Sequence, residues 1–189
     1  MSHAPPAGKL DPIAAQDTMQ GDEPKFTWED LIVDNVTPEE ASAWLAPWDW
    51  LVSGRVYPVF LSRFGNWFLR RPDGATDLLD VHEGIIERVA PTPEAFDAAV
   101  NTLDWQEQFL YSALVMRYRR QGVVARDRDA IAFAPHPALV QSIDACRPML
   151  IHMNAWQAIC GQTLRPAAGP DGRSAFTVRP DRLISAVDG

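Results

Sequence analysis

Four short segments of the kind found in β-strands follow one another in the middle of the chain, and turn sequences separate them. The segments cover residues 56–61, 66–70, 75–80 and 85–89. The separating turns are Arg63-Phe64-Gly65, Arg71-Pro72-Asp73-Gly74 and His82-Glu83-Gly84. Runs of this length and spacing predict strands, and Pro-Asp-Gly is a sequence that ties neighbouring strands together. We therefore expect a single antiparallel β-meander.

Helix signals precede the predicted sheet. Thr27 is followed by acidic residues, which predicts a short helix or turn, because acids stabilise the positive end of a helix. Thr37-Pro38-Glu39-Glu40 is a stronger start, with a capping box and proline at the first helical position. Pro47 is expected to end this second helix.

Further helix signals follow the sheet. Thr92-Pro93-Glu94 starts one helix, and a second is predicted from Leu103 or Asp104 to Arg120. Residues 129–134 are predicted to form a strand. A last helix is expected within residues 144–164, running through residues 151–159, with Gly161 as its stop. The predicted fold class is α+β, an antiparallel β-meander sheet packed against several helices.

The ends of the chain differ in composition from its middle. Residues 1–24 are rich in proline, alanine, glycine and aspartate without an apolar period, and residues 165–189 are similar. Such composition predicts disorder. A chain of 189 residues with 47% hydrophobic content can bury one core. We expect a single domain over residues 25–164, between a disordered acidic tail and a flexible C-terminal extension.

Acidic residues are concentrated in the first quarter of the chain. Residues 1–50 contain ten acids and two lysines, whereas the other 139 residues contain fifteen acids and fifteen arginines. The whole formal charge of −8 therefore belongs to the first 50 residues. An acidic segment repels phosphate and attracts cations, which argues against direct nucleic-acid binding and favours a basic partner.

The sequence also carries expectations about compartment and cysteine chemistry. No apolar run approaches the roughly 20 residues that span a bilayer, and the N-terminus lacks the pattern of an export signal. We expect a cytoplasmic protein without membrane contact. Cys146 and Cys160 lie in apolar surroundings and are expected to be buried thiols rather than a metal or redox motif.

The sequence contains no recognisable catalytic motif, so we expect no enzyme activity. The chain has no phosphate loop, dinucleotide fingerprint, nucleophile elbow or zinc-type spacing, and its histidines are isolated in sequence, so no cofactor is expected. Four polar residues around the end of the third strand could supply acid–base or metal chemistry in a hydrolase, although strand ends and turns use such residues routinely. They are Asp77, Asp80, His82 and Glu83.

Several local sequences resemble one family. They are residues 58–74, 78–80, 87–90, 129–139 and 155–162. Together they resemble the bacterial immunity proteins that protect against type VI secretion DNase effectors, over about residues 55–164. Two departures concern Val140-Gln141-Ser142, where the family usually has paired glycines, and the N-terminal half, which is longer in many members.

The resemblance implies a noncatalytic protein that binds a cognate toxin of the same cell and covers its active site. The partner is then a basic protein toxin, such as a nuclease. Candidate contacts are the acidic and aromatic residues of the ordered N-terminal segment, although at least two of its tryptophans are expected in the core. They are Trp28, Glu29, Asp30, Glu39, Glu40, Trp44, Trp48 and Trp50. The alternative is a structural or adaptor component of a phage-like or secretion assembly, with the tails as docking arms.

Overall fold

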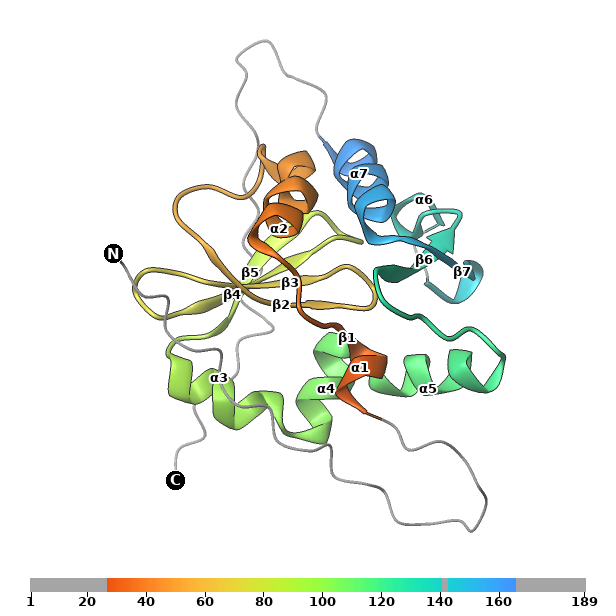
Figure 1. Ribbon diagram of the computed structural model, residues 1–189, viewed down its shortest axis with the longest axis horizontal. Coiled ribbons are helices and arrows are strands. Elements are labelled where there is room, and N and C mark those ends of the chain that lie inside the picture. Colours follow the sequence, from red (N-terminus) through yellow and green to blue (C-terminus); the bar gives the residue numbers. More distant parts are fainter. Residues whose placement is uncertain (1–26, 141–142, 166–189) are drawn as a thin grey trace.

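A five-stranded antiparallel sheet forms the centre of the protein in the computed structural model, which describes residues 27–140 and 143–165 (Figure 1). The strands lie in sequence order, each paired with its neighbours along the chain. They are β1 (Ile32–Val33), β2 (Tyr57–Ser62), β3 (Trp67–Arg70), β4 (Thr76–Asp80) and β5 (Ile85–Ala90). The predicted meander is confirmed, with β1 as an additional short edge strand. The expected tails, residues 1–24 and nearly all of 165–189, lie outside the described residues.

Helices surround this sheet. In Figure 1, α3, α4 and α5 run along the lower side of the sheet, and α2 and α7 lie above it. The helical elements are α1 (Trp28–Leu31), α2 (Pro38–Leu45), the 3₁₀ turn η1 (Ala46–Trp48), α3 (Pro93–Val100), α4 (Leu103–Leu110), α5 (Ser112–Arg120), α6 (Pro137–Val140), the 3₁₀ turn η2 (Ile143–Ala145) and α7 (Met153–Leu164). The architecture is a single α+β domain, as predicted. No helix within the described ranges is both long and apolar enough to span a bilayer.

The helix starts follow the predicted capping chemistry. Thr37 Oγ1 accepts from the backbone N–H of Glu40 at 3.2 Å, and the Glu40 carboxylate accepts from the Thr37 N–H at 2.9 Å. This capping box satisfies two backbone groups that would otherwise lack a partner at the start of α2. Thr92 Oγ1 similarly accepts from the N–H of Ala95 at the start of α3.

The long helix expected over residues 103–120 is in fact two helices. Tyr111 has a left-handed backbone with φ of 53° and separates α4 from α5. This break places its ring edge-on against Phe64, with 5.5 Å between ring centroids. The carboxylate of Glu107 then accepts from Ser112 Oγ and from the N–H of Ala113, which caps the new helix.

The expected helix through residues 151–159 is also corrected, because its first part is a strand. β7 (Arg147–His152) pairs antiparallel with β6 (Asp129–Ala134), whose strand character was predicted. Residues 149–151 are a short apolar run, which periodicity cannot assign to strand or helix. Gly161 does not end α7, which continues to Leu164. A Cβ at Gly161 would lie 2.6 Å from Cβ of Pro47, so the glycine permits close contact between α7 and η1.

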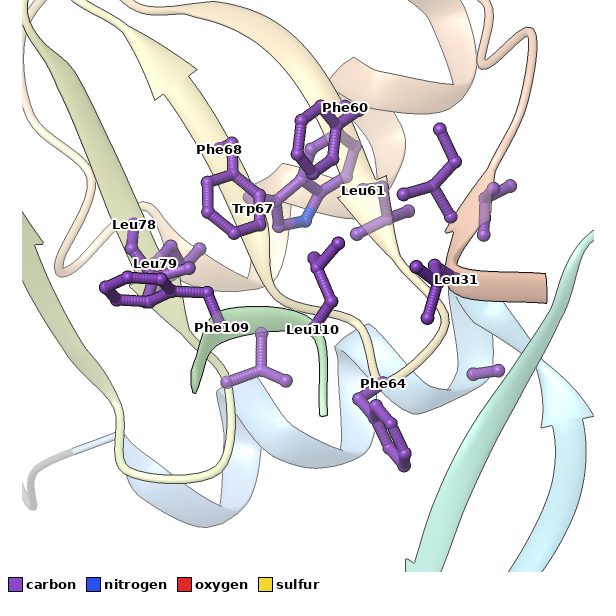
Figure 2. Packing of buried hydrophobic residues seen from close by; sticks show 14 of the residues in the cluster. Leu31, Phe60, Leu61, Phe64, Trp67, Phe68, Leu78, Leu79, Phe109 and Leu110 are labelled. Carbon is purple, nitrogen blue, oxygen red and sulfur yellow. The ribbon is translucent and has the colours of Figure 1, made fainter. Parts of the chain in front are cut away.

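The core extends over both faces of the sheet. All five residues of β4 are buried, which requires cover on each side. Figure 2 shows Phe60, Trp67 and Phe68 side by side within this core. The centroids of the Phe60 and Phe68 rings are 4.5 Å apart, and Trp105 from α4 lies 5.1 Å from Phe68. Aromatic packing of this kind joins β2 and β3 to the lower helices.

The turn between β2 and β3 is held by α7. Trp156 Nε1 donates to the carbonyl oxygen of Phe64 at 2.8 Å, and Gln157 Nε2 donates to that of Gly65 at 2.7 Å. Gly65 has φ of 97°, and a Cβ there would lie 2.9 Å from Trp156 Cδ1. Two of the family-like segments, residues 58–74 and 155–162, therefore meet in space and form part of the scaffold.

Candidate partner-binding surface

The tryptophans of the N-terminal segment belong mainly to the core. Trp44 is 3% exposed and Trp48 is fully buried, which contradicts their assignment as partner contacts and fits the expectation of at least two in the core. Trp48 Nε1 donates to Gln157 Oε1 at 2.7 Å, and its ring lies 6.0 Å from that of Trp50. Trp28 and Trp50 are half-buried and pack on the core as well. The aromatic residues therefore anchor this segment to the fold.

Some acids of the same segment form salt bridges within the chain. Glu40 binds Arg128 through two oxygens, at 2.7 and 2.9 Å, and Asp30 forms an ion pair with Arg119. The Arg128 side chain, helped by the N–H of Thr37, holds the pKa of Glu40 below its ordinary value. Asp30 and Glu40, two of the predicted partner contacts, are thus engaged in ion pairs within the chain.

A buried arginine fixes the position of α1. Arg63, at the β2–β3 turn, is 4% exposed and donates to the carbonyl oxygens of Glu29, Asp127 and Asp129. Burial lowers its pKa from the ordinary value. Charged side chains of both signs line a hollow of about 530 Å³ around α1 and residues 124–128, where they offset one another. The N-terminal segment is therefore tied to distant parts of the chain by arginines.

Four carboxylates of this segment are exposed, and one of them, Asp49, pairs with Arg165 at 2.8 Å. Glu29, Asp34 and Glu39 are exposed, and none of them takes part in a salt bridge within the described ranges. The Asp34 carboxylate accepts from the backbone and side-chain nitrogens of Asn35 at 2.8 and 2.6 Å. These residues are the part of the predicted acidic surface that a partner can reach, and Asp34 was not among the candidate contacts.

An apolar hollow of about 260 Å³ opens beside this segment, between β1, the first half of β2 and α3. Its floor contains the buried side chains of Phe60, Trp67 and Phe96, and carboxylates of Asp34 and Asp97 stand among its lining residues. Sequence reasoning missed this hollow. Its lining comes from four segments separated along the chain, residues 32–36, 58–61, 67 and 96–100, so no local pattern of the sequence marks it.

The carboxylates that could serve a hydrolase, around the end of β4, have structural partners. Asp77 binds Arg71 at 2.6 Å and Arg88 at 3.3 Å. Asp80 Oδ1 accepts from the N–H groups of His82 and Glu83, which stabilises the β4–β5 turn. Burial of the His82 ring lowers its pKa. In the described part of the chain, no three histidine, cysteine or acidic side chains are grouped to hold a metal ion.

A second buried histidine contacts a cysteine. His136 Nε2 lies 3.3 Å from Cys160 Sγ, and the backbone N–H of Ala138 donates to His136 Nδ1. Burial lowers the pKa of His136 to about 4 and raises that of Cys160. At neutral pH this pair is a neutral imidazole beside a thiol, which is the wrong protonation state for a nucleophilic cysteine. The expectation that Cys146 and Cys160 are buried thiols is confirmed.

Comparison of the chain with protein-family models gives no match, and comparison with curated proteins gives no significant match. The likeness to immunity proteins therefore depends on the local sequences quoted above. In the fold, these sequences lie in strands β2 to β6, the β2–β3 turn and helices α6 and α7.

Proposed function

We propose that the protein is a noncatalytic, immunity-type binding protein that neutralises a cognate bacterial toxin by covering its active site. The observation that carries the proposal is the set of exposed carboxylates on the N-terminal segment that form no salt bridge within residues 27–140 and 143–165, namely Glu29, Asp34 and Glu39. A toxin that cuts nucleic acid must attract phosphate through basic residues. An acidic surface suits such a target, because it competes for the same basic residues.

The way this segment is held supports the proposal. Arg63 and Arg128 bind its backbone, and its Trp44 and Trp48 side chains are buried in the core. A surface that is fixed before binding loses less conformational entropy when the partner arrives. The exposed acids would therefore meet a toxin in positions already set by the core.

The test begins with the partner itself. A pull-down of the full chain from its native cells should recover a toxin in stoichiometric amount, and the two genes should adjoin. Rapid-mixing kinetics with the purified toxin should then show association that slows steeply with salt. The double substitution Glu29→Lys and Glu39→Lys should slow association about tenfold.

The matched control is Asp104→Lys, which reverses one exposed acid on α4 outside the N-terminal segment. It should leave the association rate within about twofold of the parent at physiological salt. Association that is independent of salt, or equal slowing by Asp104→Lys, would remove the acidic surface from the proposal. Inhibition of the toxin that requires turnover of a substrate by this protein would overturn the noncatalytic function.

A further inference from the structure

The first half of β2 has an open edge. β1 pairs with β2 only through Ile32 with Ser62 and Val33 with Leu61. Residues 57–60 are therefore bonded to β3 on one side, and within the described residues no strand lies on the other. An unpaired edge presents backbone groups that an incoming extended segment can use.

The end of β1 explains why the edge is open. Directly after Val33, the Asp34 carboxylate binds the backbone of Asn35, which takes a left-handed conformation with φ of 50°. The chain then turns away from β2 and enters α2 at Pro38. Figure 1 shows β1 as a brief stretch beside β2 before the chain rises to α2. The apolar hollow lies where β1 would have continued.

The size and lining of the hollow define what it can hold. Its volume of about 260 Å³ is below the roughly 300–1,000 Å³ of most small-molecule sites and suits a single large side chain. Its walls include Val59 and Val100, and its floor includes Trp67. An apolar side chain that entered here would exchange water for contact with a packed floor.

Charge narrows the choice of occupant. Asp34 and Asp97 are exposed lining residues, and neither takes part in a salt bridge within residues 27–140 and 143–165. A segment with lysine or arginine on either side of its apolar residue would place cations near these carboxylates. An acidic segment would meet repulsion there.

We propose that this hollow and the open edge of β2 receive an extended segment of a basic partner protein, with one apolar side chain in the hollow and basic residues beside it. Pro58 has no N–H, and the β2–β3 pairing is irregular between Pro58 and Phe60. Few backbone hydrogen bonds are therefore available on this edge, so the apolar side chain and the flanking charges carry most of the affinity. This inference rests on the proposed function only in taking the partner to be basic.

The experiment uses the full chain labelled with ¹⁵N and the peptide acetyl-Lys-Thr-Leu-Thr-Val-Thr-Lys-amide. Alternation places Leu and Val on one face of an extended strand. We expect chemical shift changes at the amides of Val59, Phe60 and Val100 and at the indole N–H of Trp67, with a Kd of about 0.1–1 mM. A peptide with glutamate for both lysines, and one with serine for Leu and Val, should bind at least about tenfold more weakly.

The variant Asp97→Lys tests the lining directly, because this exposed carboxylate has no salt bridge to lose within the part of the chain that the structure describes. It should weaken binding of the lysine peptide about three- to tenfold at low salt, whereas Asp104→Lys should change the Kd less than twofold. Equal binding of the lysine and glutamate peptides would overturn the proposal. So would an absence of shifts at the hollow up to about 5 mM peptide.

Two other occupants would also overturn it. Nuclear Overhauser effects in the free protein between the hollow and residues outside 27–165 would show that the chain covers the hollow itself. Chemical shifts of the hollow's residues that change with protein concentration, in the absence of peptide, would show that a second copy of the chain occupies the hollow. Neither result concerns the toxin, so the two proposals can fail separately. If the Glu29 and Glu39 variant loses toxin binding but the peptide causes no chemical shift changes at the hollow, the proposed function stands and only this inference is rejected.

Discussion

The indole nitrogen of Trp48 donates a 2.7 Å hydrogen bond to Oε1 of Gln157, 109 positions further along the chain. The same Gln157 side chain donates through Nε2 to the carbonyl oxygen of Gly65. One fully buried amide therefore joins η1, the β2–β3 turn and α7. It connects the Trp-rich N-terminal segment to the scaffold that carries the family-like sequences.

Replacement of this amide should be costly. Gln157→Leu keeps a similar volume but leaves the Trp48 N–H and the Gly65 carbonyl without their partner. Each buried unsatisfied group costs about 1–3 kcal/mol, so the free energy of unfolding should fall by about 2–4 kcal/mol in urea denaturation. The control Gln162→Leu, exposed on the same helix, should change it by less than about 0.5 kcal/mol. Equal effects of the two substitutions would reject the bridging role.

Gly161→Ala tests the contact between α7 and η1. Helix propensity alone predicts stabilisation by about 1 kcal/mol. The new Cβ, however, would lie 2.6 Å from Pro47 Cβ and 2.8 Å from the Pro47 carbonyl oxygen. We expect net destabilisation by at least about 1 kcal/mol, since overpacking costs about 1–3 kcal/mol.

The matched measurement for that glycine is Ala155→Gly, at an exposed position of α7. This change reports the propensity term without the clash and should destabilise by up to about 1 kcal/mol. If Gly161→Ala stabilised the protein as much as Ala155→Gly destabilised it, the contact with Pro47 would not be tight.

The sheet and the helix starts could be predicted from the sequence because their signals are local. Turn sequences such as Pro72-Asp73-Gly74 and capping residues such as Thr37 act on their immediate neighbours. The strand β7 could not be predicted in this way. Its apolar run, residues 149–151, becomes a strand because it pairs with β6, which lies about twenty positions earlier in the chain.

The candidate surface was predicted only in outline for a similar reason. The excess of acids in the first 50 residues was visible, but Glu40 pairs with Arg128, 88 positions away. No local pattern separates Glu40 from its exposed neighbour Glu39. The apolar hollow depends on where β1 ends relative to β2, which is a property of strand pairing and not of either sequence alone.

Acidification should reveal the Glu40–Arg128 pair. The pKa of Glu40 is lowered in the folded protein, so its contribution to stability is present above the unfolded pKa of about 4.3 and is lost as the pH falls through the folded value. Urea midpoints measured from pH 7 to 3 should fall more steeply for the parent than for Glu40→Gln. Glu39→Gln, on the same helical turn, should retain the parent's pH dependence. Identical curves for the parent and Glu40→Gln would contradict the ion pair.

The His136–Cys160 contact predicts a pH dependence in a higher range. Because the N–H of Ala138 donates to Nδ1, the neutral ring carries its proton on Nε2 and donates toward Cys160 Sγ. Protonation of Nδ1 would break the Ala138 bond and place a charge in the core. Accordingly, burial lowers the pKa of His136 to about 4, whereas an unfolded histidine has a pKa of about 6.5. Between these values the unfolded chain binds more protons, so stability falls as the pH falls.

We therefore expect the titration of His136 to lower the free energy of unfolding by about 1–2 kcal/mol as the pH falls from 7 to 5. His136→Asn keeps an acceptor for the Ala138 N–H but does not titrate, so its unfolding free energy should fall less over this range. The comparison uses the difference between pH 7 and pH 5 within each protein, which removes any constant cost of the substitution. NMR of the parent should show the His136 ring neutral at pH 5. A ring that titrates near pH 6.5, or equal pH differences in the two proteins, would mean that His136 is open to solvent and that its contact with Cys160 does not hold it neutral.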